Sequence, residues 1–320
     1  MQATIDASAL KHLTKALTCL SKYSDELVMY ATREHFILSA TNSSLSAYCR
    51  FKYGRQFFQR YSARDHPTLD EKPDDVRVSG QLLVKSLISI LKHRTVEKSV
   101  DRCELSVTEG RDGAQGGDID DQDSLESKLT VRLHCKHGVV KTHRLLLMNA
   151  PALMVPTAPD ASCESKLSIS ARALKDLLDH FPIARGPKSD PQLVWSFSDD
   201  ELVLKGLESS LDTSVRGQLS TELSISSAEF EVYDVYEPPT TIAFHLREFL
   251  ATVSFADSLL LPIDMRFTDP AAPLFLEVDG DLADTLFVLS TSQVHDTDAP
   301  LARAESVQPR GRKRELEPAE

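Results

Sequence analysis

Apolar side chains recur at the spacing of an α-helix in several segments of the chain. In the first segment the apolar residues fall on one stripe at about 100° per residue, and lysines lie nearly opposite. The stripe consists of Leu10, Leu13, Leu17 and Leu20, and the lysines are Lys11, Lys15 and Lys22. In the second segment Val84, Leu87, Ile88 and Leu91 face inward, with Lys85 and Lys92 on an exposed flank. Both segments are predicted to be amphipathic helices with a cationic outer face.

Both helices recur in the second half of the chain. IDASALKHL at 5–13 aligns with ISARALKDL at 169–177, and VKSLISIL at 84–91 aligns with LREFLATV at 246–253. Lys175 then occupies the place of Lys11, with Arg172 beside it, and Arg247 occupies the place of Lys85. Asp176 and Asp179 weaken the basic surface of the third helix. Self-similarity at a nearly constant offset indicates a tandem duplication.

Strands are predicted around these helices, because apolar and polar residues alternate there with a period of two. The first half contains such segments at 26–32, 35–41, 44–53, 103–108, 129–135 and 139–148. The second half contains them at 193–198, 201–207, 219–226, 229–235, 262–268, 274–279 and 285–290. Each half thus has antiparallel sheets and two helices, an α+β class. We predict a first domain at 1–148, a connector at 149–165, a second domain at 166–293 and a disordered tail at 294–320.

Composition is that of a globular protein without a membrane segment, with 41% hydrophobic and 26% charged residues among 320. The first residues lack the features of a secretory signal, and five scattered cysteines without a CxxC pair fit free thiols in a reducing compartment. We therefore expect a protein that stays inside the cell.

The formal net charge of −12 argues at first against a nucleic-acid partner. Much of the acid, however, lies in two segments predicted to be mobile loops, 62–75 and 109–126. If the four helices share one side, their cations form a basic face that could hold a phosphate backbone without reading bases. Each exposed cation gains only about 1 kcal/mol near a phosphate in water. Tight retention would then have to come from the topology of the complex and not from the energy of these contacts. A basic cluster in the tail fits a nuclear-import signal, with Arg310, Arg312, Lys313 and Arg314.

The stretch RLHCKHGVVKTHRL at 132–145 combines three histidines with a cysteine. A tight turn at His137 and Gly138 would pair residue 134 with residue 141, which places His134 and His143 on one face. Clustered cations share that face, and no carboxylate or second cysteine completes a tetrahedral set. The cations are Arg132, Lys136 and Lys141. A polar-faced hairpin is the preferred interpretation, and we predict no metal site.

Catalytic signatures are absent from the sequence: it has no GxSxG, no HExxH, no P-loop and no glycine-rich dinucleotide turn. The pair Asp199-Asp200 lies in turn-like sequence. Asp279 and Asp281 could hold Mg²⁺ in a 3'-5' exonuclease, although a DGD turn explains them more simply. We predict a protein that is not an enzyme, with no catalytic residue and no cofactor. The exonuclease and an interaction scaffold that touches no DNA remain alternatives.

Several motifs resemble the sliding DNA clamps, and more closely the Rad-nine family of subunits of the nine-one-one checkpoint clamp. They are TNSSLSAY (41–48), FFQRY (57–61), VKSLISILKHRTVEKSVDRCE (84–104), LHCKHGVVKTH (133–143) and FLATVSFADSLLLPIDMRF (249–267). The resemblance covers residues 1 to about 293 and implies the sliding-clamp fold. The two acidic loops look longer than is usual in the family, and the tail looks shorter.

The resemblance also implies a role. It implies a nuclear, heterotrimeric ring with two related subunits, loaded on double-stranded DNA by a clamp loader, that recruits checkpoint and repair factors without a membrane partner. It implies that the helix cations face the duplex, and that the connector residues Leu153, Met154 and Val155 contact partner peptides. Ser292, followed by Gln293, fits the dipeptide that damage-response kinases prefer. The DNA-facing cations would be Lys11, Lys15, Lys22, Lys85, Lys92, Arg172, Lys175 and Arg247.

Overall fold

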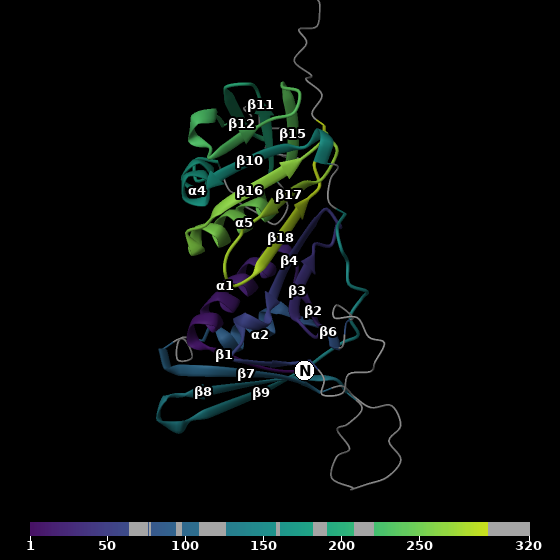
Figure 1. Cartoon of the computed structure of the whole chain (residues 1–320), viewed down its shortest axis with the longest axis vertical. Helices are drawn as coiled ribbons and strands as arrows, with labels where there is room; N and C mark the ends of the chain where they lie inside the picture. Colours follow the sequence, from purple (N-terminus) through teal and green to yellow (C-terminus); the bar gives the residue numbers. More distant parts are fainter. Residues whose placement is uncertain are drawn as a thin grey trace, which may run out of the picture.

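A computed structural model describes residues 1–63, 76, 78–93, 98–108, 126–157, 161–181, 191–207 and 221–293. The predicted import cluster, the predicted tail beyond Gln293 and nearly all of both acidic loops lie outside these residues. Within them, the chain forms antiparallel sheets with helices on one side (Figure 1).

The elements follow the order that the sequence predicts. The first half contains β1 (Gln2–Asp6), α1 (Ala7–Tyr23), β2 (Glu26–Ala31), β3 (His35–Thr41), β4 (Ala47–Gly54), β5 (Arg60–Ser62), β6 (Val78–Leu83), α2 (Val84–Leu91), β7 (Val100–Thr108), β8 (Lys128–Cys135) and β9 (Val140–Leu146). The second half contains β10 (Ser165–Ser170), α4 (Ala171–Leu178), β11 (Gln192–Phe197), β12 (Glu201–Leu207), β13 (Glu222–Ser226), β14 (Val232–Asp234), β15 (Thr240–His245), α5 (Leu246–Leu259), β16 (Pro262–Phe267), β17 (Leu274–Glu277) and β18 (Asp284–Leu289).

The sheet topology repeats strand for strand between the halves. The order β5-β1-β7-β8-β9 in the first half recurs as β14-β10-β16-β17-β18, and the order β4-β3-β2-β6 recurs as β13-β12-β11-β15. One antiparallel joint, β18 against β4, fuses a sheet from each half into a nine-stranded sheet. The predicted α+β duplication is thereby confirmed. Strands β9 and β13, the counterparts of the two joined strands, are left as sheet edges among the described residues.

The hairpin of β8 and β9 is confirmed, but its predicted register is wrong by one residue. The turn is a three-residue 3-10 segment, Lys136–Gly138, and His134 pairs with Val140 instead of Lys141. A slip of one residue moves each side chain of a strand to the other face. His143 therefore lies beside the buried Val131, on the face opposite His134. The imidazole of His134 contacts the carboxylate of Glu104 at 2.9 Å instead.

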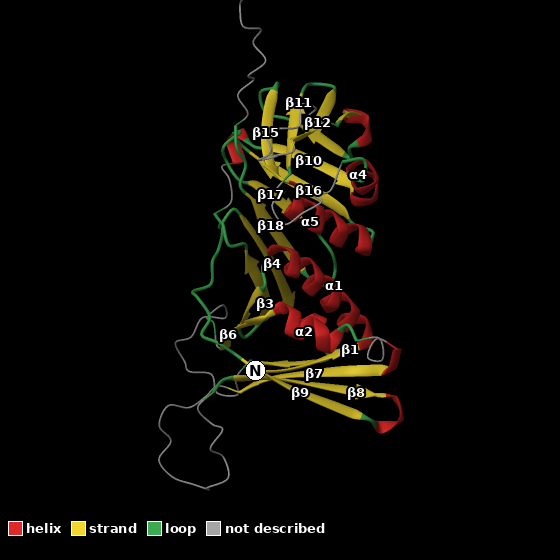
Figure 2. Ribbon diagram, turned by 180° about the vertical axis from the view of Figure 1, so that it is seen from behind, coloured by secondary structure: helices red, strands yellow, loops and turns green. Residues whose placement is uncertain are grey.

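The four helices form one continuous row, in the order α2, α1, α5, α4, down one side of the molecule (Figures 1 and 2). Helix α1 begins where the Asp6 carboxylate accepts a hydrogen bond from the Ala9 N–H at 2.8 Å, which caps an otherwise unsatisfied donor. The predicted leucine stripe is buried against the sheets. Helix periodicity thus sets which face each helix turns to the core and leaves the lysine side outward.

The joint between the halves is a buried aromatic cluster beneath α1 and α5. The ring of Phe255 on α5 lies with its centroid 5.0 Å from that of Phe51 on β4, and Phe51 lies 5.6 Å from Phe287 on β18. The hydroxyl groups of Tyr23 and Thr252 share a buried hydrogen bond of 2.6 Å across the same joint. The two copies of the repeat therefore share one core.

Lowering the pH is expected to destabilise this joint through His12 on α1. This side chain is buried among the rings of Tyr53, Phe57 and Phe255. Burial, together with the nearby positive charge of Lys15, lowers the pKa of His12 from 6.5 to about 4. The unfolded chain therefore binds this proton more readily, and stability is lost as the pH falls from 6.5 towards 4. The loss amounts to about 3 kcal/mol at most. Urea unfolding at several pH values should show this dependence, and His12→Leu should remove it; an unchanged dependence in that variant would contradict the assignment.

Candidate nucleic-acid interface

The eight predicted cations all lie along the row of helices. Seven of them are exposed, and Lys175 is partly exposed. Lys11, Lys15 and Lys22 come from α1, Lys85 and Lys92 from α2 and its C-terminal cap, Arg172 and Lys175 from α4, and Arg247 from α5. The structure thus brings together residues from both halves that are more than 200 positions apart in the sequence. Their exposed charges can attract a polyanion, but the cations differ in the groups that they already contact.

Lys85 is paired with an acid that the sequence reading missed. Its Nζ lies 2.6 Å from Oδ1 of Asp25, in the segment that follows α1. The hydrogen bond from Lys85, the charge of Lys85 and, to a smaller extent, the charge of Arg247 lower the pKa of Asp25. Both partners are largely exposed, so water and salt screen this pair and a phosphate could compete for the lysine.

The cations of α4 are held more firmly. Nζ of Lys175 lies 2.5 Å from Oδ2 of Asp257 on α5, and the Asp257 side chain is only 11% exposed. Arg172 contacts the same carboxylate at 3.9 Å and Asp176 at 3.6 Å. The acid at Asp257 comes from a helix 82 positions further along the chain, so the helical spacing of α4 could not reveal it. Lys175 is therefore held in an ion pair within the molecule, whereas the exposed Arg172 makes two longer contacts.

Lys15 joins the two halves through a hydrogen bond to a neutral acceptor, so this contact does not neutralise its charge. Its ammonium group donates a hydrogen bond of 2.6 Å to the carbonyl oxygen of Ser258, in the last turn of α5. A cation at the C-terminal end of a helix is stabilised by unsatisfied carbonyl groups and by the helix dipole. This contact leaves two of the three ammonium hydrogens for other acceptors.

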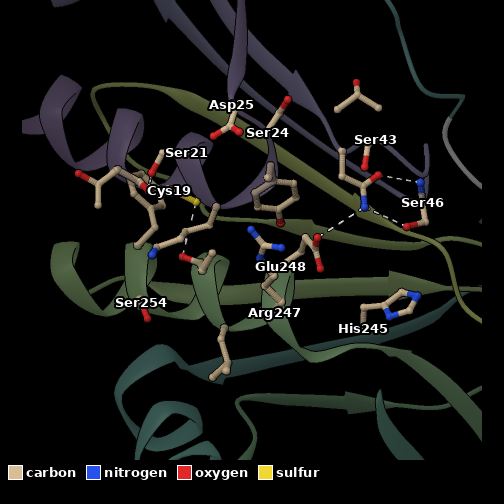
Figure 3. Close-up of a pocket in the computed structure, with 18 of the residues that line it drawn as sticks. Cys19, Ser21, Ser24, Asp25, Ser43, Ser46, His245, Arg247, Glu248 and Ser254 are labelled. Carbon is tan, nitrogen blue, oxygen red and sulfur yellow. Dashed lines mark hydrogen bonds between the residues drawn. The ribbon is translucent and has the colours of Figure 1, made fainter. Parts of the chain in front are cut away.

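A groove of about 1620 Å³ lies between α1 and α5 (Figure 3). Lys22 and Arg247 line it together with many hydroxyl groups, and at its floor the buried Glu248 accepts a hydrogen bond from Asn42 at 3.5 Å. The Asn42 side chain also donates to Ser46 at 3.0 Å, which ties the β3–β4 turn to α5. Since acidic residues line the groove together with the cations, the groove is not strongly basic.

Metal-ligating side chains do not gather in the described part of the chain. No group of three or more histidine, cysteine, aspartate or glutamate side chains there is placed to hold a metal ion. Asp279 and Asp281 are exposed residues of the turn between β17 and β18. Among the described residues, Asp279 and Asp281 therefore belong to no larger carboxylate cluster of the kind that the exonuclease alternative requires.

The connector crosses the side of the molecule opposite the helices (Figure 1). Two buried tyrosines of the sheet hold it: the Tyr30 hydroxyl donates to the carbonyl of Pro151 at 3.0 Å, and the Tyr48 hydroxyl donates to that of Met154 at 3.2 Å. Burial raises the pKa of Tyr48 to about 12, so this hydroxyl keeps its proton. Met154 and Val155 remain exposed and Leu153 is half-buried, which leaves an apolar strip facing outward. No pattern in the sequence indicates these tyrosine contacts, because they join a sheet to a connector more than 100 positions away.

Ser292 lies in an ordered position just beyond β18. Its backbone N–H donates to the carbonyl of Ala243 on β15 at 2.8 Å, and the Ala243 N–H donates back at 3.0 Å. The side chain is exposed. Phosphorylation of Ser292 stays a prediction, and a kinase that binds an extended peptide would first have to release this bridge.

Comparison with known proteins identifies the family. Residues 13–292 match the family model described as Rad9. The chain belongs to the Rad9 family. It is 24% identical to the DNA repair protein rad9 of Schizosaccharomyces octosporus, with 91% of this chain and 69% of the relative covered. The corresponding values are 23%, 86% and 66% for the rad9 protein of Schizosaccharomyces pombe, and 23%, 85% and 49% for the cell cycle checkpoint protein hpr-9 of Caenorhabditis elegans. The chain thus spans about half to two thirds of these relatives.

Solved structures identify the fold. This Rad9-family chain is similar to PCNA of Thermococcus kodakaraensis with a TM-score of 0.61 at 15% identity, covering 91% of this chain and 99% of that one. PCNA of Entamoeba histolytica gives 0.59 at 14% identity, covering 91% and 98%. The PCNA2-PCNA3 complex of Sulfolobus tokodaii gives 0.58 at 12% identity, covering 91% and 99%. The predicted sliding-clamp fold is therefore confirmed. Within the described residues, no helix combines the length and apolar character needed to cross a membrane.

Proposed function

We propose that this chain is a non-catalytic subunit of a heterotrimeric ring that encircles double-stranded DNA at damage sites. The ring supports checkpoint signalling and DNA repair, as the names of the rad9 and hpr-9 relatives suggest. Its work would be done in the nucleus, where the cluster at Arg310, Arg312, Lys313 and Arg314 would direct import. No specific observation among the described residues favours the two alternatives, an exonuclease and a scaffold that touches no DNA.

The observation that carries this proposal is the continuous row of four helices. Helices from both copies of the repeat turn cations outward on the same side, while the sheets form the opposite side. Such a face attracts any phosphate backbone and reads no base sequence. Individual contacts of about 1 kcal/mol are weak and sensitive to salt. Enclosure within a ring supplies the retention that these contacts lack.

The duplication also supplies a means of closing the ring. Within the chain, the last strand of the second copy, β18, pairs with β4 of the first. Their counterparts, β9 and β13, are both edge strands of the described sheets. A related subunit that offers a β13-like edge to β9 would repeat the internal joint between molecules. Joints of this head-to-tail kind generate a ring when the rotation closes. The PCNA2-PCNA3 complex is a multi-subunit assembly of similar fold.

The connector is the proposed contact for partner peptides. Leu153, Met154 and Val155 form a strip whose backbone is held by Tyr30 and Tyr48, so the apolar side chains are presented on a fixed path. The clamp loader and the checkpoint and repair factors are the partners that the family resemblance implies.

Retention on closed circular DNA tests the proposed function. The chain, assembled with its two related subunits and loaded, is expected to stay on a closed circle through a high-salt wash and to leave once the circle is cut. Joint charge reversal of Lys11, Lys85, Lys175 and Arg247 is expected to weaken retention while the ring still assembles. A protein that binds linear and closed DNA alike would argue against a clamp. A retention unchanged by the charge reversals would argue against the assignment of these cations to the DNA-facing surface.

A further inference from the structure

A second groove on the helix row, between α1 and α2, is more cationic than the first. Its volume is about 320 Å³. Three lysines line it, Lys11, Lys15 and Lys92, and no acidic residue is among the described residues that line it. The described lining consists of Ala7, Leu10, Lys11, Thr14, Lys15, Thr18, Leu91, Lys92 and Val100. Lys11 and Lys92 form no ion pair within the described part of the chain.

The chemistry of this groove fits a sugar-phosphate backbone. The hydroxyls of Thr14 and Thr18 donate inward to the carbonyls of Leu10 and Thr14 at 2.7 Å, so the lysines are the donors left for a phosphate. Between the lysines, the floor is formed by apolar atoms of Leu10, Leu91 and Val100 and their neighbours. Deoxyribose rings can lie on such a floor while flanking phosphates reach the ammonium groups. A small inorganic anion would use the cations but not the floor.

The repeat provides an internal comparison. Helices α4 and α5 are the counterparts of α1 and α2, and Lys175 is the counterpart of Lys11. In the second copy, however, Asp257 already binds Lys175 at 2.5 Å and approaches Arg172 at 3.9 Å. A phosphate approaching this place would meet a mostly buried carboxylate, and each cation would have to leave its partner. Among the described residues, Lys11 of the first copy is therefore open to a phosphate, whereas its counterpart Lys175 is already paired.

From this difference we infer that the two copies of the repeat do not share DNA contact equally. The α1–α2 groove of the first copy binds the DNA backbone through Lys11, Lys15 and Lys92, and Arg172 and Lys175 on α4 of the second copy contribute little. This inference rests on the proposed function, because it names the part of the helix row that touches the duplex.

Salt titration of duplex binding by the full chain tests the inference. One variant combines Lys11→Gln with Lys92→Gln, and the matched control combines Arg172→Gln with Lys175→Gln, both on α4, the counterpart of α1. A short linear duplex and fluorescence anisotropy give the logarithm of affinity against the logarithm of salt concentration. The groove variant is expected to reduce this slope by about 1.8, for two phosphate contacts at about 0.9 each, and to weaken low-salt binding about tenfold or more. The control should change the slope by much less.

Asp257→Asn gives an independent test in the opposite direction. Removing this carboxylate frees Lys175 and Arg172, so binding should strengthen and the slope should steepen by about 1 to 2. The inference would be overturned if the two double variants had equal slopes, or if the α4 variant lost more affinity than the groove variant. It would also be overturned if the unaltered chain did not bind the duplex at the lowest salt concentration. A ring that is not retained on closed circles, while the asymmetry in linear binding persists, would contradict only the proposed function.

Discussion

Replacing Phe255 with alanine is expected to destabilise the folded chain by about 3–5 kcal/mol, the cost of truncating a buried aromatic side chain. The ring is 3% exposed, and its neighbours Phe51, Phe287 and His12 belong to β4, β18 and α1. A cavity at this point is lined by both copies of the repeat, and neither copy can collapse to fill it without losing contact with the other. Urea unfolding measures the change.

Two probes make this experiment specific to the joint. Trp195, the single tryptophan, is buried in β11 of the second copy, so its fluorescence reports on that copy, whereas far-UV circular dichroism reports on both. If the copies share one core, both probes should shift together. Ser254→Ala, an exposed position on the same helix, should change stability by no more than about 0.5 kcal/mol. Two separate transitions, with only one moved by Phe255→Ala, would show that the copies unfold independently.

Periodicity was sufficient to predict the helices and most of the strands, because each element buries one face. The leucines of α1 at spacings of three and four, and the alternation in β8, leave little choice of which side faces the core. The hairpin register was not predictable in the same way. The sequence suggests a two-residue turn at His137 and Gly138, but both residues adopt positive φ within a longer turn that begins at Lys136. One extra residue in a turn changes the face of every residue that follows.

The charge state of the candidate interface was only partly predictable. The pair of Arg172 with Asp176 has the i,i+4 spacing that a sequence reveals. The pairs of Lys85 with Asp25 and of Lys175 with Asp257 join different elements, and only tertiary packing brings them together. The sequence therefore locates the cations, while the structure distinguishes the open ones from those already paired. The two copies look equivalent when their residues are aligned, and only the ion pairs in the structure show that their cations differ.

Replacing Thr142 with proline is expected to prevent ring assembly while leaving the subunit folded. The Cys135 N–H donates to the carbonyl of Val139, just before β9, at 2.8 Å, so Cys135 and Val139 form the hydrogen-bonded pair that closes the turn. Pairs alternate along an antiparallel ladder, which places the N–H of Thr142, opposite Arg132, on the open edge of the sheet. Proline there removes a donor that no described strand of this chain uses, and edge strands accept such a residue. Co-purification with the related subunits, followed by mass measurement, reports assembly.

Thr142→Val is the matched control, because it keeps the backbone N–H and changes only the exposed side chain. It should assemble as the unaltered chain does, and both variants should unfold at a similar urea concentration. Since β18 and β4 already make this kind of joint inside the molecule, the β9 edge has the backbone geometry for the same pairing with a second subunit. Normal assembly of the folded proline variant would show that the subunits meet through another surface, and the duplicated joint would then have no counterpart between molecules.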